Sequence, residues 1–154
     1  MTTWLTTEEQ QAWRGLVNLT ARLQCVLGRQ LQDEHGISLA DYEVLGRLHD
    51  APDHRLRVRD LGASLAWEQS RLSHQLARMQ RRGLVEREEC ETDRRGSTFR
   101  LTPAGRTAIA QAAPSHVEAV RRLVFDALSP DQVTQLAELT GGLLTHLHDS
   151  VRTG

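Results

Sequence analysis

The chain has 154 residues, of which 39% are hydrophobic and 25% charged, so it is large enough for one globular domain or two closely joined subdomains. No apolar run approaches the roughly 20 residues that cross a bilayer, and the N-terminus does not resemble a signal peptide, so we expect a cytoplasmic protein without membrane contact. The formal net charge is -1, so affinity for nucleic acid would have to come from a local basic surface. All 19 basic residues are arginine, and they are densest between Arg55 and Arg106.

Two helices are expected in the N-terminal third. The segment 6–10 contains two overlapping capping boxes, and apolar residues then recur at three- and four-residue steps as far as Gly36, which predicts one long helix. Ser38 can cap a second helix. The sequence Ala51-Pro52-Asp53 ends it, because the residue before a proline is disfavoured in helical conformation.

The central segment predicts a winged helix-turn-helix. We expect a short helix over residues 58–65, a second helix from about Glu68 to Gly83, and two strands at residues 84–89 and 98–101. A polar turn, Asp93-Arg94-Arg95-Gly96, joins the strands. This order of elements allows a helix to enter one DNA groove while the loop reaches the neighbouring groove.

The C-terminal third returns to a helical pattern. Thr102-Pro103 is a helix start, Pro114 should kink or break that helix, and Ser129-Pro130-Asp131 starts a last helix. The first helix and the last two carry more apolar surface than the compact centre can cover, which favours a two-fold homodimer. The predicted class is mainly α (α+β): a winged helix-turn-helix lobe at residues 38–101, and long terminal dimerisation helices within residues 1–37 and 102–154.

The candidate DNA contacts begin with the second helix of the motif. If its apolar positions face the core, the opposite face carries hydroxyl, amide, imidazole and guanidinium groups, which read base edges or hold phosphates. These residues are Gln69, Ser70, Arg71, Ser73, His74 and Arg78. Further along, Arg81 and Arg82 are expected on phosphates with Arg78. A solvated polar face is the alternative interpretation, but the adjoining loop favours DNA binding.

The loop supplies the second candidate contact. Arg94 and Arg95 can reach a narrow, electronegative minor groove, and Asp93 can orient one guanidinium through a bidentate pair. Gly96 allows the tight return of the chain.

The chain resembles the MarR family of bacterial regulators. The motifs that carry the resemblance are residues 57–61, 78–87, 93–96 and 101–105. It implies a homodimer with interlocking terminal helices and commonly a repressor that a small ligand releases from its double-stranded DNA operator. It also implies major-groove contacts from Ser70, Arg71, Ser73 and His74, and a minor-groove contact from Arg95 with Asp93 as its partner. His74 departs from the family pattern, because arginine is frequent at this position.

A small-molecule effector is the other partner that the resemblance implies. Family ligands often lie in the crevice between the dimer helices and the DNA-binding lobe. The residues that could line it here are Trp13, Leu16, Tyr42, Trp67 and His116. Trp67 is alternatively a packing residue.

The sequence gives no positive sign of catalysis, a cofactor or a metal. His146 and His148 are two residues apart and would point to different sides of a helix, so they cannot share one ion. Cys25 and Cys90 form no disulfide framework, although a redox role for either stays open. The alternatives to a DNA-binding regulator are a winged-helix protein-interaction module without specific DNA binding and, more remotely, an enzyme.

Overall fold

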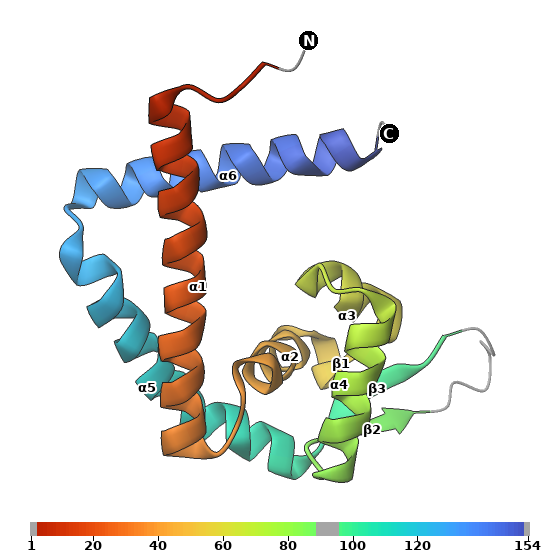
Figure 1. The fold of residues 1–154 in the computed structure, drawn as a ribbon. Helices are drawn as coiled ribbons and strands as arrows, with labels where there is room; N and C mark the ends of the chain where they lie inside the picture. The colour runs from red at the N-terminus through yellow and green to blue at the C-terminus, as the bar shows by residue number, and fades with distance from the viewer. Residues whose placement is uncertain (1–2, 89–95, 153–154) are drawn as a thin grey trace. The chain divides into compact units, whose positions relative to one another are not determined.

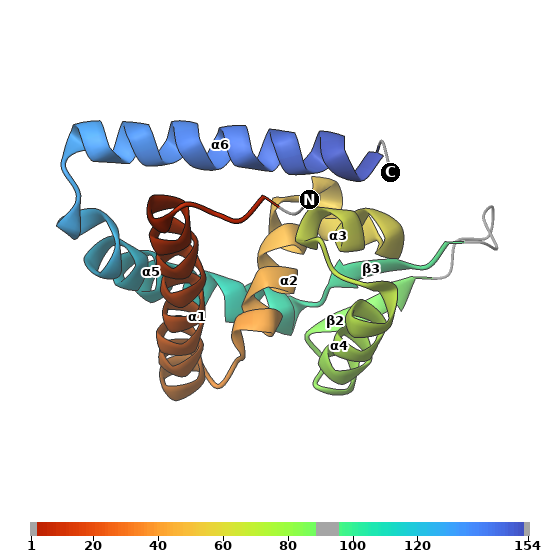
Figure 2. The same ribbon diagram turned by 45° about the horizontal axis from the view of Figure 1, so that its top comes forward.

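The computed structural model describes residues 3–88 and 96–152 and divides into two compact units, residues 1–116 and 117–154. The first unit contains α1 (Thr7–His35), α2 (Leu39–Asp50), η1 (Pro52–His54), β1 (Arg55–Arg57), α3 (Val58–Leu65), α4 (Gln69–Arg81), β2 (Val85–Glu88), β3 (Thr98–Leu101) and most of α5 (Pro103–Leu123). The second contains the end of α5, η2 (Phe125–Ala127) and α6 (Pro130–Arg152). Figure 1 and Figure 2 show these elements along the chain.

Capping chemistry sets the starts of α1 and α2, as the sequence predicts. The Thr6 hydroxyl accepts from the Glu9 N–H at 3.2 Å, and the Glu9 carboxylate accepts from the Thr6 N–H at 2.7 Å. Hydrogen bonds from Thr6 also hold the pKa of Glu9 below its usual value. Ser38 and Asp41 form the same reciprocal pair at the start of α2. Each box satisfies two N–H groups that have no partner within the helix.

The sheet contains one strand that the sequence analysis did not predict. Its order is β1-β3-β2, both pairs are antiparallel, and Phe99 lies opposite Leu56 on one side and Arg87 on the other. The missed strand, β1, has only three residues, and two of them are arginine. Such a segment has little strand signal of its own, so pairing with β3 determines its conformation.

The end of α4 is a Schellman motif. The N–H of Leu84 donates to the Met79 carbonyl at 3.1 Å, and the N–H of Gly83 donates to the Gln80 carbonyl at 3.0 Å. Gly83 has a φ of 74°, so the left-handed cap expected at this glycine is present. The motif turns the chain directly into β2.

The core of the first unit lies where α2, α3 and α4 meet the sheet and the start of α5. Its fully buried side chains are Leu31, Val44, Leu45, Leu48, Leu61, Leu72, Leu76, Met79, Val85 and Leu101. Leu72, Leu76 and Met79 come from one face of α4, as the apolar periodicity predicts. The opposite face of α4 is therefore directed to solvent.

The helix α5 continues through Pro114, so a break at this residue is wrong, whereas the alternative, a kink, stays a prediction. A proline removes one backbone N–H, and the other hydrogen bonds of a long helix can carry the chain through that position. None of the helices in the part of the chain that the structure describes is long and apolar enough to span a membrane.

Candidate nucleic-acid interface

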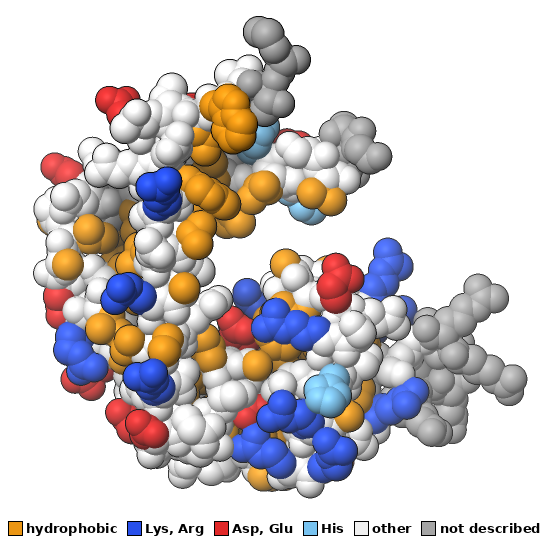
Figure 3. Space-filling view, viewed as in Figure 1, with side chains coloured by type: hydrophobic (Ala, Val, Ile, Leu, Met, Phe, Trp, Pro, Cys, Tyr) orange, Lys and Arg blue, Asp and Glu red, His pale blue; other side chains and the backbone are white. Residues whose placement is uncertain are grey.

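The exposed face of α4 holds all six residues that the sequence assigns to this helix. These are Gln69, Ser70, Arg71, Ser73, His74 and Arg78, and each is exposed. Basic side chains gather over the α4 region in the space-filling view (Figure 3). The face therefore combines hydrogen-bonding groups and positive charge on one rigid helix.

A buried polar network fixes α4 against α2. The carboxylate of Asp41, which is 2% exposed, accepts from the Gln75 amide at 2.6 Å and from the Arg82 guanidinium at 2.6 Å. Arg82 also donates to the Gly36 carbonyl at 2.9 Å, at the end of α1. The network thus ties the middle and the end of α4 to the junction between α1 and α2.

This network was missed in the sequence, and it changes the interpretation of Arg82. We expected Arg82 on DNA phosphates, and its guanidinium, although 43% exposed, is already paired with the buried Asp41 carboxylate. The one residue of the network with a visible role in the sequence was Asp41. An acid three residues after Ser38 is already explained by helix capping, so it did not indicate a buried network. Gln75 gave no signal, because a polar residue on a helix is usually exposed.

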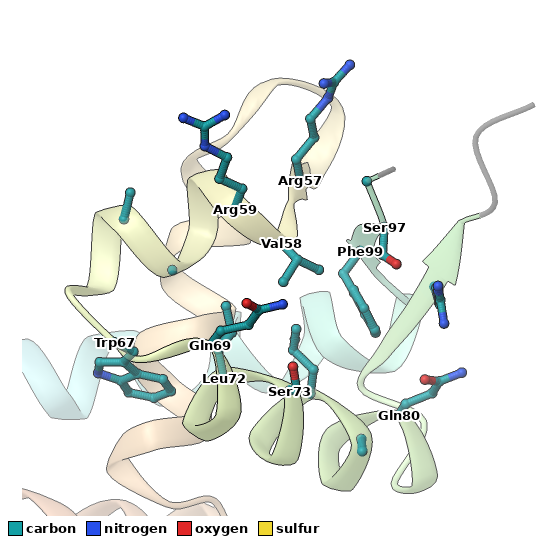
Figure 4. A pocket seen from close by; sticks show the side chains of 16 residues that line it. Arg57, Val58, Arg59, Trp67, Gln69, Leu72, Ser73, Gln80, Ser97 and Phe99 are labelled. Carbon is teal, nitrogen blue, oxygen red and sulfur yellow. The ribbon is translucent and has the colours of Figure 1, made fainter. Parts of the chain in front are cut away.

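A concave surface lies beside α4. It has a volume of about 790 Å³ and is bounded by the start of α3, by α4 and by the hairpin strands. Figure 4 shows Gln69 and Ser73 at its edge and Val58, Leu72 and Phe99 at its floor. Polar side chains of α4 and Ser97, at the base of the loop, line the same surface.

Ion pairs offset the charge of two arginines on the sheet, Arg55 and Arg100. Arg55 lies 3.2 Å from Asp53 and 3.5 Å from Glu88, and Arg100 pairs with Glu86 and Glu88. The pKa of Arg55 is raised by its hydrogen bond to Asp53 and by the charge of Glu88. The acids of β2 therefore offset Arg55 of β1 and Arg100 of β3, whereas α4 itself contains no acidic residue.

The residues suggested for an effector crevice fall in different places. The rings of Tyr42 and His116 are in contact, with centroids 4.2 Å apart. Trp67 instead lies under the guanidinium of Arg71, with 4.0 Å from Arg71 Cζ to the ring centroid. Trp13 and Leu16 are exposed on α1. Only Tyr42 and His116 are therefore joined by a direct ring contact.

Burial shifts the pKa of both members of this pair. Desolvation lowers the pKa of His116, and desolvation together with the charge of Asp50 raises the pKa of Tyr42. His116 Nδ1 is buried and has no hydrogen-bond partner among the described residues. Both rings are thus held in their neutral forms near pH 7.

The loop residues Asp93, Arg94 and Arg95 lie outside the described residues, as does Cys90. The loop contact to DNA therefore stays a sequence-based prediction. The strands that carry the loop are described on both sides of it, up to Glu88 and from Gly96.

Comparison with solved structures identifies the family. The crystal structure of AbsC, a MarR family transcriptional regulator from Streptomyces coelicolor, matches this chain with a TM-score of 0.90 and 39% sequence identity, over 96% of this chain and 99% of AbsC. This chain belongs to the MarR family. The sequence resemblance and the predicted winged-helix fold are thereby confirmed.

Two further relatives agree with this assignment. Sco3205, a MarR family regulator from Streptomyces coelicolor whose structure is in complex with DNA, matches with a TM-score of 0.91 and 39% identity, over 96% of this chain and 92% of Sco3205. The transcriptional repressor MprA of Escherichia coli (strain K12) is 25% identical over 119 residues, which is 77% of this chain and 67% of MprA. The profile of the MarR family itself matches residues 35–96 of this regulator, from the end of α1 to the loop.

Proposed function

We propose that this MarR-family chain is a cytoplasmic, homodimeric repressor that binds a roughly palindromic DNA operator. The observation that carries the proposal is the exposed face of α4, with Ser70, Arg71, Ser73 and His74 near its start. Hydroxyl, imidazole and guanidinium groups at the start of a helix are suited to base edges in the major groove. The buried Asp41 network supports the proposal, because it holds this helix rigidly.

The terminal helices support a dimer. On α1, the apolar residues Trp13, Leu16 and Val17 are about half exposed, at 59%, 48% and 46%. On α6, Leu139 and Leu144 are 66% and 67% exposed. Exposed apolar surface of this extent is typical of a protein interface. A two-fold dimer would present two copies of α4 to successive turns of the duplex.

A salt-dependent DNA-binding measurement tests the proposal. Anisotropy of a labelled duplex taken from upstream of the coding sequence is compared with that of a random duplex of equal length, across roughly 50 to 200 mM salt. We expect tighter binding to the upstream duplex. Arg78→Ala should weaken binding to both and reduce the salt slope by about 1. Ser70→Ala should weaken only the operator complex. Equal affinity for both duplexes would contradict sequence-specific regulation.

We also propose that a small molecule acts at the Tyr42–His116 pair. An aromatic surface next to His116 Nδ1, a buried atom without a hydrogen-bond partner in the described part of the chain, would suit a flat ligand that carries one hydrogen-bond donor or acceptor. A ligand that binds one arrangement of the dimer better than another would change the affinity for DNA. Such a ligand should raise the melting temperature of the wild-type protein, and it should lose that effect in His116→Phe.

A further inference from the structure

We propose that Trp67 is a positioning residue for DNA recognition, which acts by holding the guanidinium of Arg71 over its ring. The inference rests on the proposed function, because it requires Arg71 to contact DNA. The sequence analysis interpreted Trp67 as lining a ligand crevice or as a packing residue. The inference assigns Trp67 to the DNA-binding face instead.

Trp67 is a fixed platform at the turn that precedes α4. Its backbone N–H donates to the Gly62 carbonyl at 3.1 Å, and its partly buried ring packs against the hydrophobic core. The preceding residue, Ala66, has a left-handed φ of 53°, which directs the chain sharply from α3 into α4. Figure 4 shows the ring of Trp67 at this turn. The backbone at Trp67 is therefore tied to α3, and packing against the core limits the movement of its ring.

Arg71 lies four residues after Trp67, on the first turn of the exposed face. Its Cζ is 4.0 Å from the ring centroid, which is the geometry of a cation–π contact. Stacking occupies one flat face of the guanidinium. Its N–H donors lie in the plane of the group, so they stay available for a guanine edge or a phosphate.

Pre-ordering explains why this contact matters for affinity. An exposed arginine has many rotamers and loses that freedom when it binds DNA. A stacked arginine has already lost part of this rotamer freedom, so ordering it on DNA costs less. The contact also strengthens when DNA displaces water from the site, because the attraction between the charge and the ring is larger away from solvent.

Arg71→Lys is the most direct test, since it changes an exposed residue and leaves Trp67 and the core intact. Lysine keeps the charge but lacks the planar group that stacks. We expect Arg71→Lys to lower operator affinity by roughly 5-fold or more, because lysine cannot make the bidentate contact to a base edge that arginine makes. Arg47→Lys, the same exchange at an exposed position of α2, should leave affinity unchanged. Wild-type affinity in Arg71→Lys would overturn the inference.

A double-mutant cycle separates positioning from a purely structural role. Trp67→Leu should lower operator affinity by a similar factor in the wild-type protein, whereas in an Arg71→Ala background it should have less than a twofold effect. Trp67→Phe, which keeps an aromatic ring, should restore most of the affinity. If Trp67→Leu lowers affinity equally in both backgrounds, the residue acts only on the fold and the inference is wrong.

The same measurements distinguish this inference from the proposed function. Absence of preferential operator binding by the wild-type protein would reject the proposed function, and the inference with it. Strong operator binding that is unchanged by Arg71→Ala would reject only the role of Arg71 and therefore that of Trp67.

Discussion

The surroundings of Gly105 leave no room for a side chain larger than a hydrogen atom. It lies on the first turn of α5, where the Leu84 carbonyl also accepts from the Thr102 N–H at 3.2 Å. A Cβ at Gly105 would overlap that carbonyl oxygen and crowd Leu101. The junction between the sheet and α5 therefore depends on the absence of a side chain at Gly105. The Thr102 hydroxyl caps the start of α5 by accepting from the Gly105 N–H at 3.0 Å.

We expect Gly105→Ala to lower the free energy of unfolding by about 1–3 kcal/mol, because backbone atoms must move to admit the methyl group. Urea denaturation measures the loss. Gly46→Ala is the matched control, since a Cβ there meets nothing within 4 Å and alanine favours helix. Equal stability of the two variants would contradict the close approach at Gly105.

His116 gives a pH dependence with a defined sign. Burial lowers its pKa in the folded protein from the ordinary value of 6.5. The unfolded chain therefore binds the proton at a higher pH than the folded chain. The stabilising contribution of neutral His116 is complete above about pH 6.5 and is lost as the pH falls through the lowered pKa.

His116→Phe should remove this contribution while keeping a ring against Tyr42. Its free energy of unfolding should fall less than that of the wild-type protein between about pH 7.5 and pH 5. Chemical denaturation at a series of pH values provides the comparison. His148→Gln, at an exposed position of α6, should follow the wild-type profile. Identical profiles for His116→Phe and the wild-type protein would refute the role of His116.

At the scale of an element, α4 carries two adjacent arginines with different roles. Arg82 pairs with the buried Asp41, whereas Arg81 is exposed at the end of the helix. Removal of a charged donor from a buried carboxylate leaves that carboxylate poorly compensated. We therefore infer that the orientation of α4 depends on Arg82, and we propose that its electrostatic attraction to DNA depends on Arg81.

Arg82→Ala should lower the free energy of unfolding by about 1–3 kcal/mol. Arg81→Ala should leave stability within about 0.5 kcal/mol of the wild-type value, as is usual for a surface substitution, and should weaken DNA binding at low salt. Urea denaturation and DNA anisotropy on both variants separate the two effects. A stable Arg82→Ala protein would show that Asp41 does not anchor α4 through this residue.

At the scale of the whole molecule, the exposed apolar side chains of α1 and α6 determine the expected assembly. Their exposure within a single chain would be costly in water, and a second copy is the partner that a two-fold regulator requires. The proposed dimer would in turn set the separation of the two α4 helices. Loss of the dimer should therefore weaken operator binding without any change at α4.

Leu139→Glu should convert a dimer into a monomer in sedimentation velocity and reduce operator affinity at least tenfold, because a monomer reads only one half-site. The control, Gln132→Glu, places the same charge on α6. The side-chain oxygen of Gln132 accepts from the Ser129 N–H at 2.9 Å, and a glutamate oxygen can accept in the same way. This control should stay dimeric. A monomeric wild-type protein would contradict the proposed assembly.

The sequence by itself determined the starts of α1 and α2, the end of α4 and the two faces of α4. Capping at Thr6 and Ser38, the left-handed glycine at Gly83 and the apolar repeat of α4 are local signals, which act between residues a few positions apart. The six candidate DNA contacts of α4 followed from that repeat. The family motifs could be identified for the same reason.

Only the tertiary structure decided the contacts between distant segments. The pairing of β1 with β3, the bonds from Gln75 and Arg82 to Asp41, and the contact of Tyr42 with His116 join residues far apart in the chain. A buried polar residue and an exposed one look alike in a sequence, because burial depends on what the folded chain places beside them. For this reason the pairing of Arg82 with Asp41 could not be predicted from the sequence, which indicated only a contact of Arg82 with DNA phosphates.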